Sequence, residues 1–240
     1  MWVLALLLGV SALPVLPAYF WLRARKFPLT PLWFLLSLLA GAASLFIAAL
    51  IQSRYTALLG ARESGFGMFV FHLFVRIALT EEAGRGLALF GFFCLMRAFK
   101  RAFPVSACFD KEDLSGAAAL GGATGLLAGL GFALVETASY GTGAADITLA
   151  LTRSVTAAPL HGACGIRVGM AAALLGRRPV HSALRFLSAA ALHGMYNFMV
   201  LNPRIPRALP LILAFLALFS SLQAIKSPPP AGAPPAGAPD

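Results

Sequence analysis

Two adjacent carboxylates, Glu81 and Glu82, lie inside a stretch that is otherwise almost wholly apolar, and Arg85 follows one helical turn after Glu81. A carboxylate at bilayer depth costs roughly 2.5 to 3.5 kcal/mol even on lenient insertion scales, so such groups face a bundle interior and usually mark a functional site. The acidic pair is therefore the first candidate for a functional centre.

Further polar residues lie within or at the end of other long apolar segments, namely Glu136, His161, His193 and Asn197. Three pairs are spaced by four residues, so each pair shares one helix face: Glu81 with Arg85, Phe132 with Glu136, and His193 with Asn197. An acid that activates water, imidazoles that bind a metal or stabilise an oxyanion, and an amide donor make a plausible hydrolytic set. The same groups serve equally as proton relays in pumps and transporters, so the residues alone leave both chemistries open.

Simpler roles exist for individual members of this set. Arg85 can neutralise a neighbouring glutamate as a structural ion pair, and His193 and Asn197 can form interhelical hydrogen bonds. His72 and His181 lie near a helix end and in a loop, and neither is assigned a catalytic role. The chain contains no HExxH or GxSxG motif, and every aspartate falls in a predicted loop or in the tail. A zincin site, a nucleophilic serine of that type and an intramembrane aspartyl dyad are thereby excluded.

Composition predicts a polytopic membrane protein. The 240 residues are 59% hydrophobic and 12% charged, against about 25% charged in ordinary soluble domains. The formal charge of +10 comes from short basic runs between apolar segments, which argues against nucleic acid as a partner and for membrane topology. The three cysteines form no CxxC pair, so neither a disulfide framework nor a thiolate metal site is inferred.

The predicted fold is an all-α integral membrane bundle of about seven spans, which are placed at about 2–22, 31–52, 66–99, 115–139, 148–175, 181–201 and 208–225. The third span is too long for one straight crossing, and a break is expected at Gly84 and Gly86, beside the acidic pair. Residues 1–226 form one predicted domain whose motif-bearing core is about 66–200. Residues 227–240 are rich in Pro, Ala and Gly and form a predicted disordered tail.

Lysine and arginine residues predict the orientation in the cell membrane. The first span lacks a basic n-region and is read as a retained span. The basic groups at 23–26, 97–111, 177–178 and 226 fall on one side of a seven-span arrangement. That side is predicted to be cytoplasmic, with the N-terminus outside and the C-terminus in the cytoplasm.

Glycines recur every four residues in two of the predicted spans. They are Gly121, Gly125 and Gly129 in one and Gly165 and Gly169 in the other. Small residues at this spacing form grooves in which neighbouring helices approach closely, so these glycines are predicted to be packing faces.

The ordered motifs resemble those of the PrsW family of intramembrane proteases. They are EEAGR at 81–85, GFALVE at 131–136, His161 alone, and HGMYN at 193–197. The family looks related to the group that contains the CAAX prenyl endopeptidases and bacteriocin-immunity membrane proteins. Two positions depart from the family pattern, because Arg85 stands where Lys is usual and Thr137 where Asn is frequent. Arginine keeps the charge but brings a rigid planar fork in place of a point ammonium.

The resemblance implies cleavage of membrane-anchored proteins, with anti-sigma-factor-like substrates as one possibility. The resulting hypothesis makes Glu81 the general base for water and Glu82 a second acidic member, with Arg85 beside them. Glu136, His161 and His193 complete the centre and could hold a divalent metal, for which the ligand types favour zinc.

A metal-free centre is equally open at this point. In that version, Glu81 polarises water directly, and His193 and Asn197 donate to the developing oxyanion. Two other functions stay open as alternatives: a proton-coupled membrane transporter and a non-catalytic scaffold or immunity-type membrane protein. The expected partners are membrane-anchored substrates and the lipid bilayer.

Overall fold

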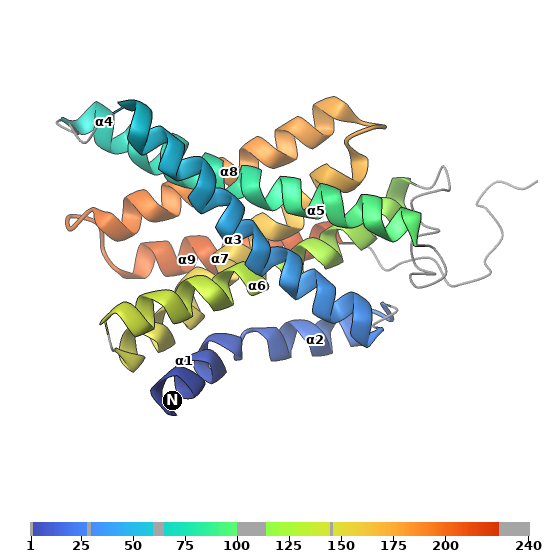
Figure 1. Ribbon diagram of the computed structural model, residues 1–240, viewed down its shortest axis with the longest axis horizontal. Coiled ribbons are helices and arrows are strands. Elements are labelled where there is room, and N and C mark those ends of the chain that lie inside the picture. Colours follow the sequence, from blue (N-terminus) through green and yellow to red (C-terminus); the bar gives the residue numbers. More distant parts are fainter. Residues whose placement is uncertain (1, 28–29, 60–64, 100–113, 145, 226–240) are drawn as a thin grey trace, which may run out of the picture.

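The protein is helical throughout the part of the chain that its computed structural model describes, namely residues 2–27, 30–59, 65–99, 114–144 and 146–225. The elements are α1 (Trp2–Ala12), α2 (Val15–Ala24), α3 (Pro31–Leu59), α4 (Phe66–Phe71), η1 (His72–Leu79), α5 (Thr80–Ala98), α6 (Leu114–Ala144), α7 (Ile147–Leu174), α8 (Pro179–Leu201) and α9 (Ala208–Ala224). Figure 1 shows most of these helices extending between the two ends of the long axis, with α3 crossing α6 obliquely. The all-α prediction is confirmed for the described residues, and the predicted tail at 227–240 lies outside them.

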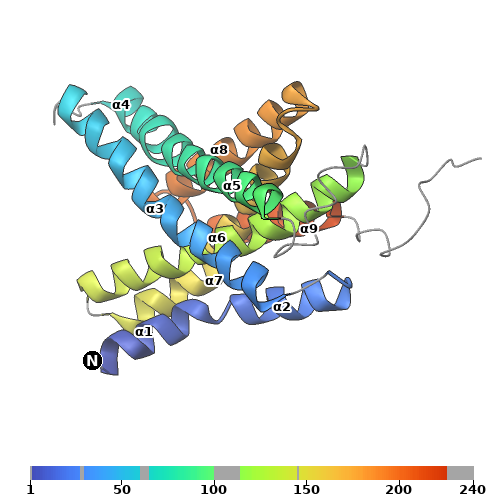
Figure 2. The same cartoon turned by 45° about the vertical axis from the view of Figure 1, so that its right-hand side comes forward.

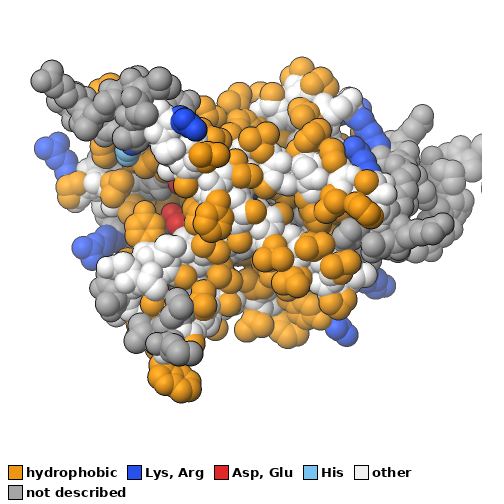
Figure 3. All heavy atoms as spheres, in the orientation of Figure 1, with side chains coloured by type: hydrophobic (Ala, Val, Ile, Leu, Met, Phe, Trp, Pro, Cys, Tyr) orange, Lys and Arg blue, Asp and Glu red, His pale blue; other side chains and the backbone are white. Residues whose placement is uncertain are grey.

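Within the described residues, three stretches of helix are long and apolar enough to cross a membrane: Ala5–Ala24, Pro31–Arg54 and Leu114–Gly143. A shorter apolar helix covers Ala208–Ala224. Figure 3 shows hydrophobic side chains over most of one face, with the visible Lys and Arg side chains gathered toward the two ends of the long axis. This distribution is typical of a protein that crosses a bilayer along that axis. The count of seven crossings is not confirmed by length and composition.

The first predicted span consists of two helices. α1 ends at Ala12, and α2 begins at Val15 after Pro14. Proline has no backbone N–H and its ring clashes with the preceding turn, which accounts for the interruption.

The break predicted at Gly84 and Gly86 is not confirmed, because α5 is continuous through both glycines. The irregular part of the segment precedes them and is the π-helical stretch η1, which leads directly into Thr80 and the acidic pair. Gly84 has a packing role rather than a role in breaking the helix, since a Cβ there would lie 2.9 Å from the backbone oxygen of Ser44 in α3. The glycine allows two helices to approach closely.

α6 and α7 run side by side through the bundle (Figure 1, Figure 2). A Cβ on Gly125 would overlap the carbonyl oxygen of Gly165, and a Cβ on Gly165 would overlap that of Gly125. Gly129 meets the carbonyl of His161 in the same way. The packing role predicted for these glycines is confirmed, and the backbone contact brings the second half of α6 against the part of α7 that carries His161.

Candidate active site

The N-terminal part of α5 supplies the acidic pair to the interior of the bundle. Glu82 and Arg85 are three residues apart on one helix face and form an ion pair in which neither side chain has exposed surface, 0% for each. The second carboxylate oxygen of Glu82 lies 2.8 Å from Nδ1 of His193 in α8. Because an ionised carboxylate only accepts, Nδ1–H of His193 donates this bond. Both oxygens of Glu82 are therefore engaged by buried donors.

Glu81 is also buried but differs from Glu82 in its partners. Its Oε2 is buried with no hydrogen-bond partner, and it lies 3.6 Å from Nε2 of His193. Its Oε1 lies at the limit of a hydrogen bond, 3.5 Å, from Nε2 of Gln52 in α3, which also donates to Thr80. One oxygen of Glu81 is therefore available to accept a proton or a hydrogen bond from a bound molecule.

α6 and α7 together orient His161. Its Nε2 lies 2.8 Å from Oε2 of Glu136, and the same oxygen lies 2.7 Å from Nη2 of Arg153. Nε2–H is the donor to the carboxylate, which leaves Nδ1 of His161 as an acceptor, 3.3 Å from Nη2 of Arg85. At metal sites, a carboxylate commonly accepts from the far ring N–H of a ligating histidine and so fixes the tautomer of its imidazole.

Aromatic contacts hold the two imidazoles in place. The rings of His161 and His193 are perpendicular with their centroids 5.0 Å apart. Phe132 of α6 packs on His161 at 4.9 Å, and the guanidinium of Arg85 lies over the Phe132 ring at 4.6 Å. Residues from four helices thus form one buried polar cluster.

The sequence-predicted residues meet in this cluster with one exception. Asn197 is half-buried on α8, one turn beyond His193, and among the described residues no hydrogen bond of its amide to the cluster is seen. Sequence reasoning did not select Arg153 and Gln52. Arg153 stands eight residues before His161, on nearly the same helix face, inside a predicted apolar span, and a charge at such a place is the signal that could have identified it.

The donors that could hold a metal are Glu82, His161 and His193, each offering one ligand atom within 4.8 Å of the others. The predicted set contained Glu136 in place of Glu82. In the structure, Glu136 contacts the far nitrogen of His161, where it orients the ring.

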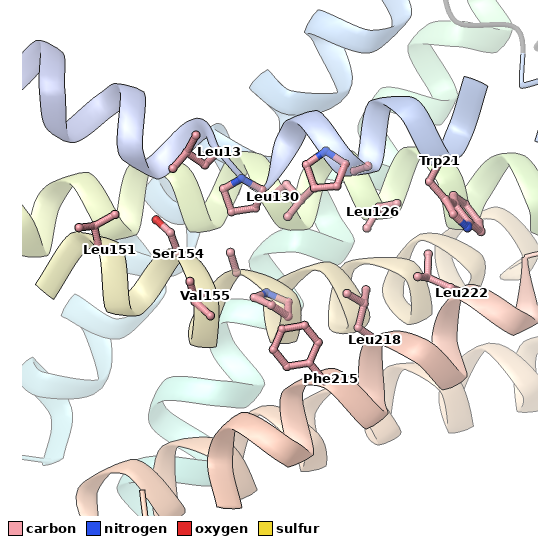
Figure 4. A pocket seen from close by; sticks show the side chains of 15 residues that line it. Leu13, Trp21, Leu126, Leu130, Leu151, Ser154, Val155, Phe215, Leu218 and Leu222 are labelled. Atoms are coloured by element: carbon pink, nitrogen blue, oxygen red, sulfur yellow. The ribbon is translucent and has the colours of Figure 1, made fainter. Parts of the chain in front are cut away.

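A cavity of about 480 Å³ between α2, α6, α7 and α9 is separate from this cluster. Figure 4 shows its wall of apolar side chains, including Trp21, Leu130, Phe215 and Leu218. Neither the glutamates nor the histidines of the cluster line it. Ser154 is the polar side chain among its lining residues, and the others are apolar.

Comparison with known proteins places the chain in a family. Residues 30–222 match the profile of the PrsW family of intramembrane metalloproteases. The chain belongs to the PrsW family. No curated protein and no solved structure matches it significantly. The resemblance drawn from the motifs is confirmed, and as a PrsW protein the chain is an integral membrane peptidase.

The PrsW family description implies a divalent metal, and the cluster fits one in its donor chemistry. Glu82, His161 and His193 are buried and supply one carboxylate and two imidazoles, a ligand set used by catalytic zinc sites. His161 is further supported by Glu136. The unpartnered Oε2 of Glu81 lies beside this set, 3.6 Å from Nε2 of His193.

Proposed function

We propose that this PrsW protein hydrolyses peptide bonds of membrane-anchored proteins at the cluster of Glu81, Glu82, His161 and His193. The observation that carries the proposal is the buried, unpartnered oxygen of Glu81 next to a group of metal-ligand type. Buried polar atoms are rarely left without a partner, and exceptions occur where a bound molecule completes the site.

Glu81 is the general base in this proposal. Its Oε2, which lies 3.6 Å from Nε2 of His193, accepts a proton from the attacking water. The hydrogen bond of His193 to Glu82 fixes the imidazole, and Arg85 balances the charge of Glu82. Asn197, one turn along the same helix, supplies an amide for the developing oxyanion, a role in which loss of one donor typically costs about 10²- to 10³-fold.

Glu82, His161 and His193 would hold the divalent metal, and their types favour zinc. When bound, zinc supplies a Lewis acid and lowers the pKa of a bound water to about 7. Glu136 accepts from Nε2–H of His161 and so keeps the proton off Nδ1, whose lone pair would pass from Arg85 to the metal, and Arg153 holds Glu136 in turn. This assignment keeps every predicted site residue and gives Glu136 a positioning role.

The proposed setting is the cell membrane, with seven crossings, the N-terminus outside and the C-terminus in the cytoplasm. The third crossing is proposed to run through α4, η1 and α5, with π-helical turns in place of a break. The gathering of basic side chains toward both ends of the long axis supports crossing of the bilayer along that axis (Figure 3). The substrates are proposed to be membrane-anchored proteins, including those that resemble anti-sigma factors.

Profiling of protein N-termini tests the function without a known substrate. Membranes and medium are compared from cells that make the wild type, Glu81→Gln or Asp146→Asn at matched, folded levels. Asp146→Asn is the control, because it makes the same carboxylate-to-amide change at an exposed helix cap that asparagine also fills well. New ends near transmembrane segments should appear with the wild type and the control and be absent with Glu81→Gln. Identical ends from the wild type and Glu81→Gln would contradict the proposal.

A further inference from the structure

A second cavity, of about 320 Å³, lies at the opposite end of α8 from His193 and outside the Glu/His cluster. Arg178, His181 and Arg185 line it, together with Ser115 in the first turn of α6. The rest of its lining is apolar and comes from the start of α6 and the ends of α7 and α9. One wall of the cavity is therefore basic and the other is apolar.

Carboxylates do not balance this charge within the described residues. The acidic side chains there are Glu81, Glu82 and Glu136, which belong to the cluster, and Asp146, which caps the other end of α7. Arg185 donates from Nη1 to the sulfur of Met170 at 3.1 Å, and a thioether is a weak acceptor. The arginines of the basic wall thus keep charged N–H donors for which strong acceptors of the described residues compete little.

A further arginine extends the positive region inward. The guanidinium of Arg167 is bound by three serine hydroxyls, those of Ser188, Ser220 and Ser221, each at 3.1 Å. Ser188 in turn donates to the backbone oxygen of Arg185 at 2.7 Å, which ties Arg167 to the wall of the cavity. Neutral hydroxyls solvate a guanidinium but do not cancel its charge, so Arg167 adds to the positive potential.

We infer that this cavity binds a phosphate group. Arginine forks match phosphate oxygens in geometry and charge, and basic pockets between membrane helices bind lipid headgroups. The apolar wall beside the arginines would accommodate the glycerol or acyl part of an anionic phospholipid. A phosphate-bearing solute offers the same headgroup chemistry without the apolar part, so the two sources differ in how much of the cavity they fill.

Titration of the purified full-length protein in detergent micelles tests the inference, with bound lipid counted by native mass spectrometry. The probes are phosphatidylglycerol, phosphatidylcholine and inorganic phosphate. The variants are Arg178→Gln and Arg185→Gln, and the control is Arg23→Gln, which changes an exposed arginine of α2 whose side chain donates to the hydroxyl of Tyr19. Phosphatidylglycerol should bind saturably, and each cavity variant should weaken binding roughly fivefold, as expected for one arginine near a headgroup.

The competition step separates the two sources of phosphate. If millimolar inorganic phosphate does not displace phosphatidylglycerol, the lipid is the ligand, and displacement shows a site for phosphate itself. Equal affinity of the wild type and both cavity variants would overturn the inference, as would an equal loss with Arg23→Gln or no saturable binding of any probe. Since Arg178 is exposed, its variant should fold even if Arg185→Gln does not.

Discussion

The ion pair between Glu82 and Arg85 makes a quantitative prediction about stability. Replacing Glu82 by Gln leaves the Arg85 guanidinium with 0% exposure and without its ion-pair partner. Breaking a buried pair by removing one partner typically costs about 3 to 5 kcal/mol in the free energy of unfolding. The hydrogen bond that His193 donates to Glu82 also loses its ionised acceptor and is weakened, so we expect Glu82→Gln to fall in the upper part of that range.

The reciprocal change, Arg85→Met, leaves the Glu82 carboxylate with His193 as its remaining donor and removes the contact over Phe132. We expect a similar loss of about 3 to 5 kcal/mol. Replacing both residues together removes both charges, and exchange of a buried pair for uncharged groups is often nearly neutral. The double variant should therefore recover at least half of the combined loss of the single variants.

Reversible unfolding in mixed micelles of increasing SDS fraction measures these free energies. The fully buried Trp33 on α3 gives a fluorescence signal that should change when the helices separate. Asp146→Asn again provides a carboxylate-to-amide control. If the free energy of unfolding of Glu82→Gln is within about 1 kcal/mol of that of the wild type, the reasoning is refuted. It is also refuted if the double variant loses as much free energy of unfolding as the two single variants together, because interacting residues must deviate from additivity.

Three further predictions concern packing, positioning and the metal. Gly165→Ala should cost about 1 to 3 kcal/mol in the same unfolding assay, because its Cβ would overlap a backbone oxygen of α6. The control is Gly91→Ala, whose Cβ would meet open space and which should be neutral or stabilise the protein by up to about 1 kcal/mol. Equal stabilities of the two variants would contradict this account of the glycines. Arg153→Gln should lower kcat about 10- to 100-fold with KM little changed and the fold retained, with partial rescue by Arg153→Lys; a change in KM alone would point to substrate binding instead. Chelator treatment of the purified protein should abolish peptide cleavage and reduce bound metal to well below one equivalent, and zinc should restore both; full activity in the metal-depleted protein would refute the metal role.

The positions of the helices could be predicted from the sequence because a bilayer sets the length of an apolar run. α3, α7, α8 and α9 begin or end within a few residues of the predicted spans, apart from the longer C-terminal end of α3. Most of the cluster could be predicted for a related reason. Polar side chains inside such runs have to face one another, since no other place in the bundle satisfies them.

The details that the sequence could not decide depend on how the helices are rotated and spaced. The sequence does not distinguish a glycine that permits a kink from one that permits two helices to approach closely. At Gly84, the position of α3 distinguishes the two roles. The choice between Glu82 and Glu136 as the third ligand depends on which nitrogen of His161 each carboxylate faces. Sequence spacing carries no information about that orientation.

The backbone contact between α6 and α7 also has a consequence for motion. Because Gly125 and Gly165 touch through main-chain atoms, neither helix can slide or tilt against the other without a collision that no side-chain rotation relieves. The two helices move as one rigid wall that carries Glu136 and His161 together. If the cluster is the proposed active site, displacement of α5 or α8 on its other side would admit a polypeptide and would also shift Glu81 or His193, so admission would be coupled to assembly of the site.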